Sequence, residues 1–402
     1  MILGIDASNI RVGGGVTHLV ELLRAASPEQ HGFELVIAWG GSKTLSRLSD
    51  SPWLRKVHLP VLDMSLPRRA AWQRFVLSRL AGAAGCDVLF VPGGSYVGDF
   101  HPVVTMSRNM LPFELHELAR FGWSSLTLKL LLLRLTQSRT FRRADGLIFL
   151  TRYANDIVMR TVGRTMAVTT IIPHGIDDHF LLAPREQRPI SCYNSGRPFR
   201  IIYVSIVDVY KHQWFVADAV AKLRAAGLPV ALSFIGPAYL PALKRLTRTL
   251  RRLDATGDFL RYEGPILHTE LHARYAEADL CVFASSCENM PNILLEGMAS
   301  GLPIASSNRG PMPEVLGDGG VYFDPEKADN IAKALSALID SPELRAQVAL
   351  KAFERAKSYS WRRCAGETLQ FLARVSRVQP EIQADGRRLR SQSAKESLHN
   401  RK

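Results

Sequence analysis

The stretch SSCENMPNILLEGMASGLPIA, residues 285–305, decides how the rest of the chain is interpreted. It follows an apolar run at 280–284 that is typical of a buried strand, and it passes from loop-forming residues into helical spacing. It contains two glutamates, Glu288 among the loop residues and Glu296 within the helix. Parallel α/β folds bind ligands where a strand leads through a loop into a helix, and the free N–H groups of that helix suit an anion such as a diphosphate.

Length and composition indicate a folded protein of more than one domain. The chain has 402 residues, of which 47% are hydrophobic and 22% are charged, and such values are typical of a globular protein with two or three domains. No apolar run reaches the roughly 20 residues that a membrane span requires. The first residues, MILGID, have the pattern of a strand. We therefore expect neither a membrane span nor a signal peptide.

The cysteines and the net charge indicate a reducing compartment and an acidic partner. The 5 cysteines are irregularly spaced and no pair has zinc-ligand spacing, so we expect reduced thiols in the cytoplasm. The net charge of +14 favours nucleic acid, anionic lipid or a phosphorylated substrate, and charge alone does not choose among them. Because no nucleic-acid-binding motif is present, we expect no nucleic-acid partner.

Strand-like and helical patterns alternate along most of the chain. The strand-like runs lie at 2–6, 34–39, 88–91, 103–106, 146–150, 169–172, 201–205, 230–235, 261–266, 280–284, 304–306 and 321–323. Strands that alternate with helices predict an α/β fold with parallel sheets covered on both faces. The proline- and arginine-rich stretch 183–199 has no periodicity and is predicted to link two such units. Paired units of this kind usually bind ligand in the crevice between them.

A glycine-rich loop follows the first predicted strand. It ends in Gly13, Gly14 and Gly15, and helical spacing begins directly afterwards. Strand, glycine loop and helix is an arrangement that lets the backbone approach a phosphate closely. The loop lacks the GxGxxG spacing of dinucleotide-binding folds, and a tight turn that needs glycine explains the same residues equally well.

Two predicted helices, 67–84 and 126–143, combine apolar with basic residues. Such helices can lie on an anionic membrane surface, but a core-packed helix with a solvated basic face explains each one better when taken alone. Between them, the polar loop 108–117 follows the predicted strand 103–106. Polar groups at the carboxyl end of a strand are candidate substrate contacts, and Asn109 lies among them.

Residues 278–325, ADLCVFASSCENMPNILLEGMASGLPIASSNRGPMPEVLGDGGVYFDP, resemble the donor-binding segment of the retaining glycosyltransferases of family four, also called glycosyl transferases group 1. The hallmark is two glutamates with seven residues between them, followed by a helix and a small-residue turn. The residues that fall on the pattern are Glu288, Glu296, Gly301, Pro303, Glu314, Asp324 and Pro325.

Three shorter segments extend the resemblance over most of residues 170–370. YVSIVDVYKHQ, residues 203–213, is similar to the family's phosphate-contacting loop, with Lys211 at the basic position. IPHGID, residues 172–177, is similar to the turn before the domain linker. SWRRCA, residues 360–365, is similar to the start of the family's closing helix.

The resemblance implies the GT-B fold, in which two Rossmann-like domains face each other across a cleft. Residues 1–185 would bind the sugar acceptor, and residues 200–360 would bind the nucleotide-sugar donor. Residues 361–376 would form a closing helix that crosses back to the first domain. Residues 377–402 form a basic tail without any pattern, and we expect it to be disordered.

The resemblance also implies a role for each donor-site residue. Glu296 would accept hydrogen bonds from both ribose hydroxyls, because a carboxylate has two acceptor oxygens, and Glu288 would face the transferred sugar. Lys211 would hold the diphosphate as it gathers charge on leaving. Backbone N–H groups of the loop before the helix would assist it, around Asn289, Met290, Pro291 and Asn292. The base would lie near Ile266, while Asn109, Gly14 and Gly15 would contribute from the acceptor side.

The chain departs from the family pattern at two places. Many members carry a Gly-Arg pair before the lysine, where this chain has Ser205 and Ile206, so the second phosphate cation is absent or comes from Arg11 or Arg309. Where many members have Gly-Phe-Gly after the first glutamate, this chain has Asn-Met-Pro. Family members need no metal ion, and no protein nucleophile is implied.

We therefore predict a metal-independent enzyme that moves a sugar from a UDP- or GDP-linked donor to a glycan or lipid-linked acceptor. Family analogy places it in bacterial surface polysaccharide biosynthesis, such as O-antigen, capsule or exopolysaccharide. Its location would be cytoplasmic, with peripheral contact to the anionic inner face of the cell membrane. The alternatives are a non-catalytic membrane- or nucleic-acid-binding protein on a degenerate GT-B scaffold, and a nicotinamide-dependent oxidoreductase, which would need GxGxxG.

Overall fold

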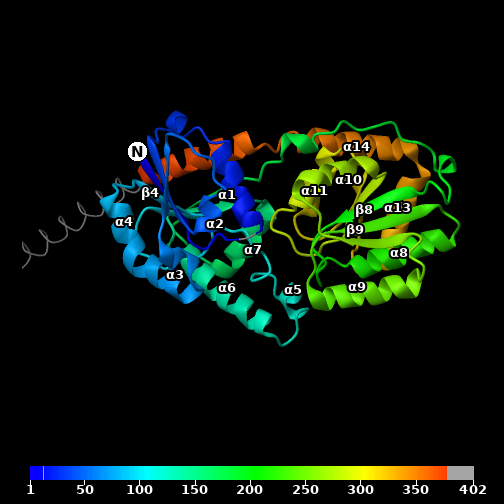
Figure 1. The fold of residues 1–402 in the computed structure, drawn as a ribbon, viewed down its shortest axis with the longest axis horizontal. Coiled ribbons are helices and arrows are strands. Elements are labelled where there is room, and N and C mark those ends of the chain that lie inside the picture. Colours follow the sequence, from blue (N-terminus) through cyan, green and yellow to red (C-terminus); the bar gives the residue numbers. More distant parts are fainter. Residues whose placement is uncertain (12, 378–402) are drawn as a thin grey trace, which may run out of the picture.

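The computed structural model of the protein describes residues 1–11 and 13–377. Its strands form a seven-stranded sheet in the order β3-β2-β1-β4-β5-β6-β7 and a six-stranded sheet in the order β10-β9-β8-β11-β12-β13. Every pairing between neighbouring strands of the two sheets is parallel. In Figure 1 the two sheets lie side by side, each with helices around it.

The first sheet consists of β1 (Ile2–Ala7), β2 (Leu35–Gly40), β3 (Leu54–His58), β4 (Val88–Val91), β5 (Val103–Met106), β6 (Gly146–Phe149) and β7 (Val168–Ile171). Its helices are α1 (Gly14–Arg24), α2 (Ser42–Leu45), α3 (Leu66–Trp72), η3 (Gln73–Leu77), α4 (Ser78–Ala83), α5 (Leu115–Ala119), α6 (Ser125–Arg143) and α7 (Arg152–Val162). Short 3-10 turns are η1 (Pro28–His31), η2 (Pro60–Asp63) and η4 (Asp178–Phe180).

The second sheet consists of β8 (Phe199–Val204), β9 (Val230–Ile235), β10 (Leu260–Gly264), β11 (Leu280–Phe283), β12 (Ile304–Ser307) and β13 (Gly320–Phe323). Its helices are α8 (Gln213–Ala225), α9 (Leu240–Leu253), α10 (Leu271–Glu277), α11 (Asn292–Ala299), α12 (Met312–Leu316), α13 (Ala328–Asp340) and α14 (Pro342–Ala356). The 3-10 turns η5 (Ile190–Cys192) and η6 (His268–Glu270) complete this half.

Strands β4, β5, β6 and β11 are buried along their whole length, which is why their sequences are continuous apolar runs. All four residues of β4 and of β11 are buried, as parallel strands with helices on both faces require. The predicted α/β fold with parallel sheets is therefore confirmed. Between α11 and β12, Gly301 has a φ of +64°, and a Cβ there would lie 2.5 Å from the Leu182 carbonyl oxygen in the segment that precedes the second sheet, so only glycine fits there.

Two local predictions were wrong. The strand β3 was not predicted, because LRKVH carries charged residues on an edge strand whose side chains are partly exposed. The predicted single helix 67–84 is interrupted by the π-helical segment η3. Such a segment inserts an extra residue into the turn, and an amphipathic pattern does not reveal it.

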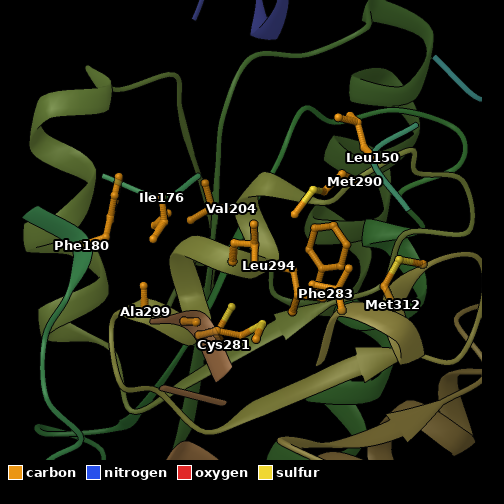
Figure 2. Close-up of a cluster of buried hydrophobic side chains, with 14 of the residues drawn as sticks. Leu150, Ile176, Phe180, Val204, Cys281, Phe283, Met290, Leu294, Ala299 and Met312 are labelled. Atoms are coloured by element: carbon orange, nitrogen blue, oxygen red, sulfur yellow. The ribbon is translucent and has the colours of Figure 1, made fainter. Parts of the chain in front are cut away.

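The two halves share a continuous apolar core. One cluster of buried side chains includes Leu150 and Ile176 from the first half and Phe283 and Leu294 from the second. Figure 2 shows Met290 in this cluster, together with Leu150, Phe283 and Leu294. The loop that precedes α11 is therefore anchored in apolar packing.

The last described segment, residues 361–377, is helical and lies against the first sheet. A Cβ on Gly146 of β6 would be 3.0 Å from a Val375 methyl group and 3.1 Å from the Phe371 ring, so this glycine permits close packing. The predicted tail lies outside the described residues from 378 onward. Among the helices that the structure describes, none combines the length and the apolarity needed to cross a membrane.

Candidate active site

Both sheets have the strand order of a doubly wound fold. In each sheet the order in which successive strands are added reverses between two central strands. The reversal falls between β1 and β4 in the first sheet and between β8 and β11 in the second. Loops beyond the carboxyl ends of these strands form the usual ligand crevice. Lys211 follows β8 and Glu288 follows β11, so two predicted site residues meet at one such point because of the topology.

Lys211 and Glu288 form an ion pair through Nζ and Oε1. The Lys211 side chain is almost fully buried, and its ammonium lies 5.2 Å from the ring centroids of both Tyr210 and Phe283. The Tyr203 hydroxyl donates to the Lys211 carbonyl oxygen at 2.6 Å and fixes the backbone. A buried charge needs such a partner, and the pair places one cation and one carboxylate where the topology puts a ligand.

His212, directly after Lys211, holds the loop in an unusual conformation. Its φ is +55°, which non-glycine residues rarely adopt. The imidazole is fully buried, its Nε2 lies 2.9 Å from Ser286 Oγ, and burial lowers its pKa to about 4. The neutral ring therefore ties the β8 loop to the β11 loop and turns Lys211 toward Glu288.

Glu296, in α11, is buried with only 5% of its surface exposed. Its Oε1 lies 3.1 Å from His268 Nε2, while its Oε2 has no hydrogen-bond partner among the described residues. Burial raises the pKa of Glu296, while the hydrogen bond from His268 and the neighbouring Tyr275 hydroxyl oppose that shift. The same bond raises the pKa of His268. A buried carboxylate oxygen without a partner is costly, and a ligand donor would satisfy it.

The loop before α11 makes contacts with the first half of the chain that were not predicted. The Asn289 carbonyl oxygen accepts from Thr151 Oγ1 at 2.9 Å, and its side-chain nitrogen lies 3.4 Å from Ser107 Oγ. The Met290 sulfur accepts the His174 N–H at 3.1 Å. These bonds join the loop to the first half of the chain.

Within the same segment, two of the expected backbone donors are not free. Pro291 has no N–H group, and the Asn292 N–H donates to the Met290 carbonyl oxygen at 3.1 Å. The side-chain oxygen of Asn292 is buried without a partner among the described residues. Ile266, expected near the base, lies between β10 and η6 and packs partly buried against the core.

The acceptor-side candidates lie at the carboxyl ends of β1 and β5. Gly13 has a φ of +69° and precedes α1, which begins at Gly14, so the glycine loop does lead into a helix N-terminus. Asn109 Oδ1 accepts the Leu111 N–H at 3.1 Å in a local turn, so this side chain also has a structural bond. Gly15 lies against the guanidinium of Arg108.

Several contacts across the two halves were not predicted. Glu314 of α12 accepts the N–H groups of Arg152 at 2.7 Å and Tyr153 at 3.0 Å, which are at the start of α7. Arg120 donates to Glu326 at 2.7 Å and to Glu117 at 2.8 Å. The sequence carries no signal for such pairs, because Glu314 lies 162 residues from Arg152 and Glu326 lies 206 residues from Arg120.

The two arginines suggested as the second phosphate cation both have partners in the structure. Arg11 donates to the carbonyl oxygens of Asp63 and Met64, at 3.3 and 3.2 Å. Arg309 lies 3.3 Å from the Asp324 carboxylate. Both guanidinium groups therefore already have partners.

One group of side chains near Glu296 could hold a metal ion. The ligand atoms of Asp177, His179 and His268 lie within 4.8 Å of one another. Two of the three have other partners, because Asp177 pairs with Arg24 at 2.8 Å and His268 with Glu296 at 3.1 Å.

Two parallel, doubly wound sheets with polar residues in the loops that follow their strands define a two-domain α/β protein, a class that usually binds ligand in the crevice between its halves. The sequence profile described as Glycosyl transferases group 1 matches residues 198–341, and the profile described as Glycosyltransferase Family 4 matches residues 12–180. The chain therefore belongs to the family 4, group 1 glycosyltransferases and has the GT-B fold.

Individual relatives agree with this assignment. A glycogen synthase of Mycobacterium tuberculosis is 29% identical over 255 residues, covering 61% of this chain and 58% of that protein. The O-antigen chain mannosyltransferase B of Escherichia coli is 31% identical over 111 residues, covering 28% of this chain and 29% of that protein. The matches thus span less than two thirds of either relative.

A solved structure shows the same fold over nearly the whole chain. Anabaena Alr3699/HepE in complex with UDP superposes with a TM-score of 0.66 at 17% identity, covering 92% of this chain and 99% of that one. At this identity the likeness establishes the fold alone.

Proposed function

We propose that this protein is a retaining glycosyltransferase that moves a sugar from a nucleoside-diphosphate sugar to a glycan or lipid-linked acceptor. The observation that carries the proposal is Glu296, a buried carboxylate with an unsatisfied oxygen at the sheet edge that binds ligands. The two ribose hydroxyls of a nucleotide would supply the missing hydrogen bonds. The family profiles and the UDP bound to the Anabaena structure support the same class of donor.

The Lys211–Glu288 pair is assigned to the reacting end of the donor. In this proposal Lys211 stabilises the charge that the diphosphate gains as its bond to the sugar C1 breaks. Glu288 keeps the lysine in place and accepts hydrogen bonds from the sugar. The acceptor oxygen bonds to C1 on the face that the phosphate leaves, and its proton passes to the leaving phosphate oxygen. No covalent intermediate with the protein is required.

The proposal includes a reaction without a metal ion. Lys211 and the site's backbone donors would replace the cation that other transferases use to neutralise a diphosphate. The group of Asp177, His179 and His268 is the place where a metal would compete with this assignment. A chelator added to the assay distinguishes the two.

The proposed biological setting is the synthesis of a bacterial surface polysaccharide, at the inner face of the cell membrane. The O-antigen mannosyltransferase among the relatives supports it. Helix α6 exposes apolar side chains, with Leu128 at 70%, Leu132 at 60% and Leu135 at 67% exposed, and the adjacent Trp123 is fully exposed. With the excess of basic residues, these side chains suit an anionic lipid surface.

An assay of nucleotide release tests the proposed activity. The protein is incubated with UDP-, GDP- and ADP-linked sugars, with and without EDTA, and the released nucleoside diphosphate is measured. We expect release from at least one donor, insensitivity to EDTA, and a product with the donor's anomeric configuration by NMR. Release from no donor would contradict the transferase assignment, and an inverted product would contradict retention.

Vesicle sedimentation tests the membrane contact. We expect binding to vesicles that contain phosphatidylglycerol and no binding to phosphatidylcholine alone. Replacing Leu128 and Leu132 by glutamate should release the protein. Equal sedimentation of the variant with anionic vesicles would show that α6 is not the contact.

A further inference from the structure

The guanidinium of Arg108 lies beyond the carboxyl end of β5, beside the start of α1. Arg108 follows β5, and its Nη2 donates to the Gly14 carbonyl oxygen at 2.6 Å. A Cβ on Gly15 would lie 3.1 Å from its Nη1. Its Nε is buried and has no hydrogen-bond partner among the described residues. The side chain is therefore held by one carbonyl group and retains unused donors.

Arg108 has no acidic partner among the described residues, unlike Arg120. Within residues 1–11 and 13–377 no ion pair involves Arg108, whereas Arg120 contacts the carboxylates of both Glu117 and Glu326. Burial lowers the pKa of Arg108 to about 10, so the group keeps its charge at neutral pH. A largely desolvated cation without a counter-ion is unfavourable unless an anion binds beside it.

The surroundings of Arg108 connect it to the proposed donor site. The preceding residue, Ser107, contacts the Asn289 side chain, which belongs to the loop before α11. The charge of Arg108 lowers the pKa of His174, after the effect of burial, and the His174 N–H binds Met290 in that loop. Arg108 is thus within electrostatic reach of the residues that hold the donor loop.

The start of α1 adds a second favourable feature at the same place. This 11-residue helix begins at Gly14, and its N-cap residue Gly13 provides no side-chain hydrogen bond. Free N–H groups at a helix start attract anions. A phosphate beside Arg108 would meet both the guanidinium and the positive end of this helix.

We propose that Arg108 is the second cation for the donor diphosphate, supplied by the first half of the chain because the loop at Ser205 and Ile206 offers no cation besides Lys211. This inference rests on the proposed function. It assigns the phosphate site to both halves, so that Lys211 and Arg108 hold the diphosphate only when the halves are together. It also accounts for Gly15, where a side chain would press against the guanidinium.

The test compares a nucleoside diphosphate with its nucleoside. UDP, GDP and ADP, with uridine, guanosine and adenosine, are titrated by calorimetry into the wild-type protein and into Arg108→Met and Arg108→Lys. We expect Arg108→Met to weaken diphosphate binding by about tenfold or more and Arg108→Lys by less, because one charged hydrogen-bonding group is lost or shortened. Nucleoside affinity should not change. The exposed Arg160 provides the matched control, Arg160→Met.

Thermal unfolding without ligand separates binding from structure. Because Arg108 is a cation without an acidic partner, Arg108→Met should leave the melting temperature of the unliganded protein unchanged or raise it. Equal diphosphate affinity in Arg108→Met and the wild type would overturn the inference, as would a parallel loss of nucleoside affinity in both Arg108 variants. If the wild type binds none of the diphosphates, the proposed function itself fails.

Discussion

The two halves of the molecule have the same strand order around their reversal points but opposite chemistry in their loops. At the second sheet the two predicted site glutamates each have a basic partner, Glu288 with Lys211 and Glu296 with His268. At the first sheet the buried Arg69 and the partly buried Arg108 donate only to neutral oxygens among the described residues. The shared topology places a possible ligand site beyond the carboxyl ends of the strands in each sheet, and the loop residues determine what each site can bind.

This difference suggests a division of tasks. The balanced second sheet is suited to the neutral ribose and sugar hydroxyls of a donor, with one cation for its phosphate. The first sheet, where Arg69 and Arg108 donate to neutral oxygens, is suited to anionic groups on the donor or on the sugar acceptor. Substitutions in the two halves test whether the loops of the two sheets differ as much as their side chains indicate.

The largest expected effect is on turnover in Lys211→Met. If Lys211 stabilises the leaving diphosphate, the substitution should lower kcat by about 10²–10³-fold. Nucleotide release from the preferred donor measures it. The exposed Lys222, which pairs with Asp329 at the protein surface, provides the control Lys222→Met. A Lys211→Met protein that keeps most of its turnover would remove the lysine from the proposed mechanism.

The next effect concerns the stability of the buried pair. Lys211→Met leaves the mostly buried Glu288 carboxylate without its partner and should destabilise the protein by up to about 3 kcal/mol. Adding Glu288→Gln removes the unpaired charge and should restore part of that loss. Urea unfolding of the two single variants and the double variant gives the coupling. Strictly additive losses would show that the two charges do not depend on each other.

A smaller effect is expected at the contact between the halves. Glu314→Ala removes the carboxylate that accepts the Arg152 and Tyr153 N–H groups at the start of α7. The loss of such a cap should cost about 1 kcal/mol, which corresponds to a melting temperature lower by about 2 °C in a chain of this size. Differential scanning calorimetry measures it, with the exposed Glu186→Ala as control. An unchanged melting temperature would show that this contact contributes no stability.

The most subtle effect is on the pH dependence of donor binding. Glu296 accepts ribose hydroxyls best as a carboxylate, so binding should weaken as the pH falls through its raised pKa. The hydrogen bond from His268 opposes that rise, so in His268→Ala the pKa of Glu296 should rise further. Titrations across the acid range should therefore show the variant losing affinity at a higher pH than the wild type. A shift toward lower pH would contradict the assigned pairing.

The sequence was sufficient for the fold because parallel strands in doubly wound sheets are apolar throughout. Runs such as 88–91 and 280–284 stand out for this reason, and the alternation with helices determines the class. The edge strand β3 carries charged residues and was not predicted from the sequence. The two site glutamates and Lys211 could be named because they lie next to predicted strands and match a family pattern.

The partners of the site residues could not be predicted. His268, which binds Glu296, is 28 residues away in sequence, and Ser286, which binds Glu117, is 169 residues away. Neither the spacing nor the composition of one sequence encodes such contacts. The bonds from Asn289 and Met290 to the first half of the chain could not be predicted for the same reason.

The central claim is that the second sheet binds a nucleoside diphosphate through Glu296, and ligand-induced stabilisation measures this most directly. Thermal unfolding of the wild type and of Glu296→Gln is followed with UDP, GDP and ADP at millimolar concentration. The account predicts that at least one nucleotide raises the wild-type melting temperature, because ligand binding stabilises the folded state, and that this rise is lost in Glu296→Gln. No rise in the wild type with any of the nucleotides, or an equal rise in both proteins, would contradict it.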